Sequence, residues 1–286
     1  MRWKGREQSK NVVDQRGAGP KVAMGGGLIG VILLAFFVLM GGDPQAAQRF
    51  LGGDQQGQQQ AQGNGGAGDD AAKEFVSVVL KDTENVWSKI FQQHGRGDYK
   101  EPTLNLFSGQ VRSGCGIASS KVGPFYCPAD QQIYIDPSFF EELRTRHNAG
   151  GDFAAAYVIA HEVAHHVQRL EAYTSYVDRV RAQGNERATN QASVRLELQA
   201  DYLAGVWAHH AQRDYQILEE GDIGEAINAA NQIGDDTLQK KSIGYAIPER
   251  FTHGSAKQRV YWFSKGLETG NFEDCAQLFD LAYDKL

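Results

Sequence analysis

Hydrophobic residues recur at helical spacing in the stretch that begins near Ala72. They are Phe75, Val78, Val79, Val86 and Ile90. Spacing of this kind places apolar side chains along one face of a helix, and that face packs against a core. The pattern therefore predicts a helix here and places the start of a folded domain, residues 72–286, close to Ala72.

Two later stretches have the alternating or β-branched character of short strands, and several longer ones have the period of buried helices. The strands are expected over residues 103–109 and 132–137, and the helices over 137–147, 152–173, 193–212, 222–234 and 255–270. Asp152 and Ser255 are suitable N-caps for two of these helices. The order of elements predicts an α+β fold that is rich in helices and has a small sheet.

A run of 19 residues without a charge, residues 22–40, follows a basic start. Residues 1–21 hold six basic and two acidic side chains, a net charge of +4, so the remainder carries −10 when the whole chain carries −6. The run can be a cleaved signal peptide or an uncleaved transmembrane helix of about 20 residues. A single transmembrane anchor is favoured because no small-residue cleavage site closes the run.

The positive-inside rule then keeps residues 1–21 in the cytoplasm as a basic tail and sends the domain across the membrane. Residues 41–71 are rich in Gly and Gln and predict a flexible linker, since they have too few large apolar groups to form a core. The acidic balance of the remainder argues against a nucleic-acid partner. The expected partners are the membrane and a substrate.

Three histidines and a glutamate interrupt the apolar helix expected over 152–173. His161, Glu162 and His165 fit the motif H-E-x-x-H. On a helix the two histidines are about 40° apart and one turn along, so both imidazoles face one point, as zinc binding requires. Glu162 lies about 100° from His161, where the general base for a zinc-activated water belongs.

A catalytic zinc needs a third protein ligand and an open position. Glu197 and Asp201 form an E-x-x-x-D pair on one face of a later apolar helix. Glu197 can complete the ligand set with His161 and His165, and Asp201 can accept the other ring N–H of a ligand histidine. The alternative is an ordinary helix face that forms salt bridges, for example with Arg195.

Two residues near the C-terminus are candidates for stabilising a transition state. His253 can donate to the oxyanion of a tetrahedral intermediate, and Arg259 can support it. The alternative roles are a cap of the helix over 255–270 for His253 and a structural ion pair for Arg259. His166 is expected to be a hydrogen-bonded core residue rather than a zinc ligand.

These residues together predict a zinc endopeptidase. The zinc ion would lower the pKa of its water toward about 7, and Glu162 would accept the proton and pass it to the leaving amine. The strand near residues 132–135 is expected to be the edge to which an extended peptide adds. Two alternatives are a binding module that zinc braces without catalysis and a zinc amidase acting on cell-wall peptides.

Cys115 and Cys127 lie in a loop rich in Gly and Pro. A disulfide between them is plausible if the domain lies outside the cytoplasm, and two reduced thiols are the alternative.

Several segments resemble the YpfJ-like, membrane-anchored neutral zinc metallopeptidases of bacteria. They are "MRWKGR", "GCG…GPFYCPAD…IYID", "GDFAAAYVIAHEVAHHVQ", "RLELQADYLAGVWAHH", "AINAANQIGDD" and "FTHGSAKQR". The resemblance covers nearly the whole chain, and the E-x-x-x-D pair with the "THGS" segment is also similar to gluzincins. It implies a zincin-like fold, one Zn²⁺ cofactor, and a single-pass protein of the bacterial inner membrane whose catalytic domain is periplasmic or extracellular.

Overall fold

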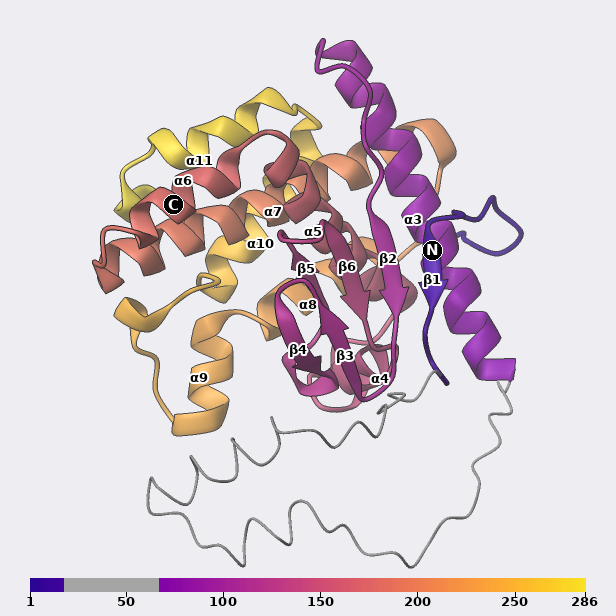
Figure 1. The fold of residues 1–286 in the computed structure, drawn as a ribbon, viewed down its shortest axis with the longest axis horizontal. Coiled ribbons are helices and arrows are strands. Elements are labelled where there is room, and N and C mark those ends of the chain that lie inside the picture. Colours follow the sequence, from indigo (N-terminus) through magenta and orange to yellow (C-terminus); the bar gives the residue numbers. More distant parts are fainter. Residues whose placement is uncertain (18–66) are drawn as a thin grey trace, which may run out of the picture. The chain divides into compact units, whose positions relative to one another are not determined.

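The computed structural model of the protein describes residues 1–17 and 67–286 (Figure 1). Helices predominate over a small sheet, which confirms the predicted α+β class. The helices are α3 (Ala67–Gln93), α4 (Ser138–Thr145), α5 (Asp152–Leu170), α6 (Tyr173–Arg181), α7 (Glu186–Tyr215), α8 (Asp222–Gln232), α9 (Asp235–Ile243), α10 (Ala256–Thr269) and α11 (Gln277–Asp280). The strands are β1 (Val12–Asp14), β2 (Thr103–Leu106), β3 (Gln110–Ser113), β4 (Gly116–Ser119), β5 (Phe125–Cys127) and β6 (Gln132–Ile135).

The main sheet has the strand order β1-β2-β6-β5. Strands β1, β2 and β6 run parallel, and β5 runs antiparallel to β6. The expectation that the strand near residues 132–135 forms an edge is therefore wrong, because β2 and β5 occupy both of its sides. The edge strands are β1 and β5, and the sequence pattern missed β5 because it has only three residues and follows a loop with Gly and Pro.

The start of the chain is part of the folded domain. Residues 1–16 and 67–286 form one compact unit, in which β1 pairs with β2. Residues 1–16 of the expected basic tail therefore belong to the domain, which was expected to cover only 72–286, while residues 18–21 lie outside the described residues. The physical reason is that "NVVD", residues 11–14, can extend as an edge strand, while the neighbouring basic side chains find acidic partners on the domain.

Among the described residues, no helix is both long enough and apolar enough to cross a membrane. The expected anchor, residues 22–40, lies outside the described residues, and so does the expected linker except for its last few residues, which begin α3.

Helix α5 lies at the centre of the core. Its residues from Phe153 to Ala164 are all buried, as the apolar run predicts. Helix α7 packs against it and begins earlier than expected, because the side chain of Asn185 caps the helix by accepting a hydrogen bond from the backbone N–H of Ala188 at 3.1 Å.

Helices α7 and α10 approach each other very closely. A Cβ atom added at Gly205 on α7 would collide with the backbone oxygen of Phe263, and one added at Gly266 on α10 would collide with that of Tyr202. Only glycine fits at these two positions. The close approach brings the first turns of α10, with Arg259, next to Asp201 on α7.

A disulfide joins Cys115 to Cys127, as the sequence analysis anticipated. Cys115 lies in the turn between β3 and β4, and Cys127 is the last residue of β5. The bond therefore ties this hairpin to the edge strand of the main sheet.

We expect the double substitution Cys115→Ser and Cys127→Ser to lower the free energy of unfolding by about 2–4 kcal/mol, because it restores the freedom of this loop in the unfolded chain. Thermal unfolding under oxidising conditions measures the effect. An unchanged melting temperature would show that the bond contributes nothing to stability. Cys275 is buried and is present in both proteins, so it does not contribute to the difference between them.

Candidate metal centre

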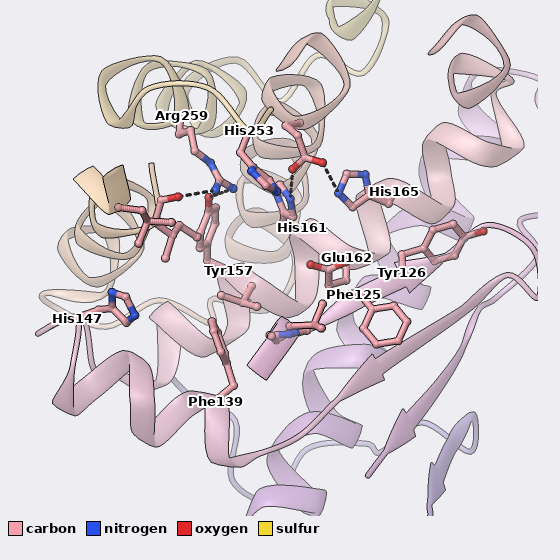
Figure 2. A pocket seen from close by; sticks show the side chains of 17 residues that line it. Phe125, Tyr126, Phe139, His147, Tyr157, His161, Glu162, His165, His253 and Arg259 are labelled. Atoms are coloured by element: carbon pink, nitrogen blue, oxygen red, sulfur yellow. Dashed lines mark hydrogen bonds and ion pairs between the residues drawn. The ribbon is translucent and has the colours of Figure 1, made fainter. Parts of the chain in front are cut away.

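Helices α5 and α7 bring two imidazoles and one carboxylate together. His161 and His165 lie one turn apart on α5, with ring centroids separated by 4.8 Å. Glu197 on α7 faces both rings: its carboxylate oxygens lie 3.2 Å from His161 Nε2 and 3.5 Å from His165 Nε2 (Figure 2). One possible ligand atom from each of the three residues lies within 4.8 Å of the other two. The structure therefore brings together the ligand set that the sequence predicts.

The far side of His161 is held by Asp201. Its Nδ1 lies 2.9 Å from Oδ1 of Asp201, which leaves Nε2 directed at Glu197. Asp201 is fully buried, and it also accepts hydrogen bonds from Arg259 Nε at 2.8 Å and from the hydroxyl of Tyr157 at 2.5 Å. An N–H bonded to a carboxylate fixes the tautomer in which Nε2 carries the free lone pair of a metal ligand.

The far side of His165 is held by a residue that the sequence analysis missed. His165 Nδ1 lies 2.8 Å from Oε1 of Gln168, which is fully buried. The amide of Gln168 donates in turn to the backbone oxygen of Leu196 at 2.6 Å and to Oε1 of Gln199 at 3.0 Å. The available signal was its position: Gln168 lies three residues after His165, on the same face of the helix.

The electrostatics of this cluster favour positive charge. Burial works to lower the pKa of His161, but Asp201 and Glu197 outweigh burial and raise that pKa to about 10. Burial likewise works to lower the pKa of His165, and Glu197 raises it above its ordinary value. Burial works to raise the pKa of Glu197, but the two histidines hold it well below its usual range. A divalent cation bound by these side chains would likewise place positive charge near the carboxylates of Glu197 and Asp201.

A donor set of two imidazoles and one carboxylate suits Zn²⁺. Among the residues that the structure describes, these three form the group that could hold a metal ion, and it contains no fourth protein ligand. Catalytic zinc sites have three protein ligands and keep one position open, whereas structural sites are closed by four. The residues present therefore fit a catalytic zinc ion.

Glu162 opens into the same cavity as the three ligand residues. The cavity has a volume of about 430 Å³ and lies between α5, β5 and the segments around α9 and α10. Its apolar side chains include Phe125, Phe139, Val158 and Leu238. Figure 2 shows Glu162 beside His161, and it shows Phe125 and Phe139 among the side chains that line the same cavity. The geometry thus places a carboxylate that is not part of the candidate ligand set in the same cavity as that set.

His253 also lines this cavity, on the loop before α10. Its Nδ1 lies 3.2 Å from Oδ1 of Asp235, and Oδ2 of Asp235 accepts the backbone N–H groups of Thr252, His253 and Gly254. The hydrogen bond with Asp235 raises the pKa of His253 above its ordinary value. Sequence analysis missed Asp235, since nothing in its spacing connects it to a residue 18 positions away.

Arg259 reaches the cavity, but the residue is 3% exposed, and its guanidinium is bound to Asp201 by Nε and Nη2, at 2.8 and 2.9 Å. This contact is the structural ion pair that the sequence analysis gave as the alternative role of Arg259. Among the described residues, the hydrogen-bond partners of Arg259 are Asp201, the hydroxyl of Tyr157 and the backbone oxygen of Ile233, so it makes no hydrogen bond with His253.

His166 points away from the cluster, as expected. Its Nε2 donates to the backbone oxygen of Lys100 at 2.6 Å, and its Nδ1 accepts from the hydroxyl of Tyr126 at 3.1 Å. Burial lowers its pKa, so the ring is a neutral, hydrogen-bonded core residue.

Comparison with known proteins gives extended matches. A family model described as "Putative neutral zinc metallopeptidase" matches residues 1–278. The chain is 42% identical over 293 residues to YpfJ of Escherichia coli K12, which covers 96% of this chain and 98% of that protein. It is also 42% identical over 214 residues to Rv2575 of Mycobacterium tuberculosis H37Rv, 71% of each chain. No solved structure matches it.

The family match spans almost the whole chain, including the start of the chain as well as the metal centre. It agrees with the geometry, because the ligand set suits zinc and Glu162 stands beside it. The chain belongs to the neutral zinc metallopeptidase family, whose cofactor is Zn²⁺.

Proposed function

We propose that the protein is a zinc endopeptidase in which Glu162 is the general base. The observation that carries this proposal is the shared cavity: Glu162 and the ligand residues His161, His165 and Glu197 all line it. A zinc ion that only braced a fold would be closed by a fourth protein ligand and would need no base. The arrangement therefore favours catalysis over a non-catalytic binding module.

The side chains of this chain would divide the work as follows. Zinc, held by His161, His165 and Glu197, would act as a Lewis acid on the scissile carbonyl and on water. Glu162 would accept the proton of the attacking water and later deliver it to the leaving amine. Helix α5 carries Glu162 directly after His161, so the proton acceptor and the two histidine ligands would keep a constant geometry.

His253 would stabilise the negative charge that develops on the carbonyl oxygen. Asp235 lies at its Nδ1, which leaves Nε2 to donate from the cavity wall. A donor held in place before the reaction costs no reorganisation in the transition state. Arg259 would act through another residue: it holds Asp201, and Asp201 orients His161.

The peptide substrate would bind along β5. This strand is the edge of the main sheet next to α5, and Phe125 and Tyr126 on it line the cavity. An extended peptide can add to such an edge by main-chain hydrogen bonds, while pockets select its side chains. The apolar lining of the cavity would accept an apolar side chain beside the scissile bond.

The disulfide supports a domain that works outside the cytoplasm, since such bonds persist in oxidising compartments. Residues 22–40 are uncharged and mostly hydrophobic, and in this proposal they attach the enzyme to the bacterial inner membrane.

Replacing Glu162 with Gln should reduce kcat by about 10²- to 10⁴-fold and leave bound zinc unchanged, because the amide cannot accept the proton. Hydrolysis of a quenched fluorescent peptide library and the zinc content of the purified protein measure the two effects. Glu268→Gln, at an exposed position on α10, is the matched control and should retain full activity. Full activity in the zinc-loaded Glu162→Gln protein would refute the assigned base.

Replacing Gln168 with Leu should weaken zinc binding about 10- to 100-fold, because His165 loses the hydrogen bond that orients its ring. Competition with a chromogenic chelator measures the affinity. Gln168→Glu, which keeps an acceptor at this place, should bind zinc more tightly than the Leu variant. The exposed Gln183→Leu change is the control, and equal zinc affinity in the Leu variant and this control would exclude an orienting role.

Replacing Asp235 with Asn should move the alkaline limb of the pH profile of kcat/KM to lower pH. The hydrogen bond with Asp235 raises the pKa of His253, so loss of the carboxylate charge lets His253 deprotonate at a lower pH. Because the cationic ring is the stronger donor, activity is lost as pH rises through this pKa. Profiles at saturating zinc test this, and coincident alkaline limbs for the two proteins would count against His253 as donor.

A further inference from the structure

The first strand of the main sheet comes from the start of the chain. Val12, Val13 and Asp14 pair in parallel with Leu104, Asn105 and Leu106 of β2. Backbone hydrogen bonds flank this register on both sides, from Leu104 N–H to the oxygen of Asn11 at 2.9 Å and from Gln15 N–H to the oxygen of Leu106 at 2.7 Å. Figure 1 shows β1 beside β2 and α3. Residues 11–15 are thus an integral part of the sheet.

Side chains before β1 are fastened to the domain as well. Trp3 donates from Nε1 to Asp152 Oδ2 at 2.7 Å, and its ring packs edge-on against Phe75 of α3 at 5.4 Å. Asp152 is the first residue of α5, the helix that carries His161 and His165. The start of the chain therefore touches the beginning of the metal-binding helix.

The basic character of this segment is matched by acidic groups of the domain. Arg6 forms an ion pair with Asp82 at 2.7 Å, and Asp82 is 2% exposed. Ser9 donates to the buried carboxylate of Glu84 at 2.5 Å, and Asn11 donates to Glu84 at 2.9 Å. These contacts give the buried carboxylates of Asp82 and Glu84 hydrogen-bond partners. A buried carboxylate without such a partner would destabilise the folded protein.

We infer that residues 1–16 and the domain over 67–286 lie on the same side of the membrane, as one folded unit. A chain that crossed the bilayer once between residues 16 and 67 would separate β1 from β2 and Trp3 from Asp152. The positive charge of the start, interpreted from the sequence as a cytoplasmic retention signal, serves in part to pair with Asp82. This inference is independent of the proposed peptidase activity.

Single cysteines in the full-length protein test the inference in living bacteria. Gln8→Cys and Ser242→Cys replace exposed residues of the N-terminal segment and of α9. Intact cells, and then lysed cells, are treated with a maleimide that reaches the periplasm but cannot cross the inner membrane. The unsubstituted protein sets the background, since Cys275 is buried and the other two cysteines form the disulfide.

The same-side arrangement predicts that both positions react to the same extent in intact cells, or that both react only after lysis. Reaction of Ser242→Cys before lysis and of Gln8→Cys only after lysis would overturn the inference, and so would the reverse pattern. Zinc content confirms that each variant is folded before it is scored. Loss of peptidase activity alone does not bear on the result.

Discussion

Asp201 carries a buried negative charge at the point where α5, α7 and α10 meet. Its carboxylate binds Arg259 through two nitrogens, accepts a hydrogen bond from Tyr157 and holds the Nδ1 side of His161. Burial alone would raise its pKa, but Arg259 and His161 lower that pKa to about 2, so the group stays ionised. Removing one partner of such a buried pair typically costs about 3–5 kcal/mol, because the other charge is left uncompensated. The candidate metal centre and the packing of three helices therefore depend on one side chain.

The close contact of α7 and α10 makes this pairing possible. Gly205 and Gly266 let the two helix backbones meet, and Arg259 then lies within hydrogen-bond distance of Asp201. On the opposite side, Gln168 links His165 to the backbone of α7. The two candidate ligand histidines are thus braced differently, His161 by a charged group and His165 by a neutral amide. Both braces come from buried residues, so the ligand geometry is set by the core rather than by mobile loops.

The start of the chain adds a second constraint on the same helix. Trp3 binds Asp152 at the first turn of α5, and β1 extends the sheet whose other edge, β5, borders the cavity. The disulfide in turn holds the β3–β4 hairpin to β5. Elements far apart in sequence therefore support the two walls of the cavity: α5 with its ligands on one side and the edge strand on the other.

By itself, the sequence predicted the helix-rich class, the long apolar helices and the candidate ligand set of His161, His165 and Glu197, with Asp201 as a brace. Local spacing predicts the two pairs, His161 with His165 and Glu197 with Asp201, because residues four apart on a helix share a face. The two pairs were joined into one site by the chemistry of zinc, which needs a third protein ligand. The disulfide could be named as well, from two cysteines in one short loop. Short strands such as β1 and β5 could not be identified, since three residues carry too little periodicity and their stability comes from the neighbouring strand.

Tertiary structure alone decided the remaining features. It made β5 the edge of the sheet, joined residues 1–16 to the domain, paired His253 with Asp235 and assigned Arg259 to Asp201. Each of these contacts joins residues that are distant in sequence or belong to different elements, and no local pattern encodes such a distance. They arise because buried charges and unpaired strand edges must find partners once the helices pack.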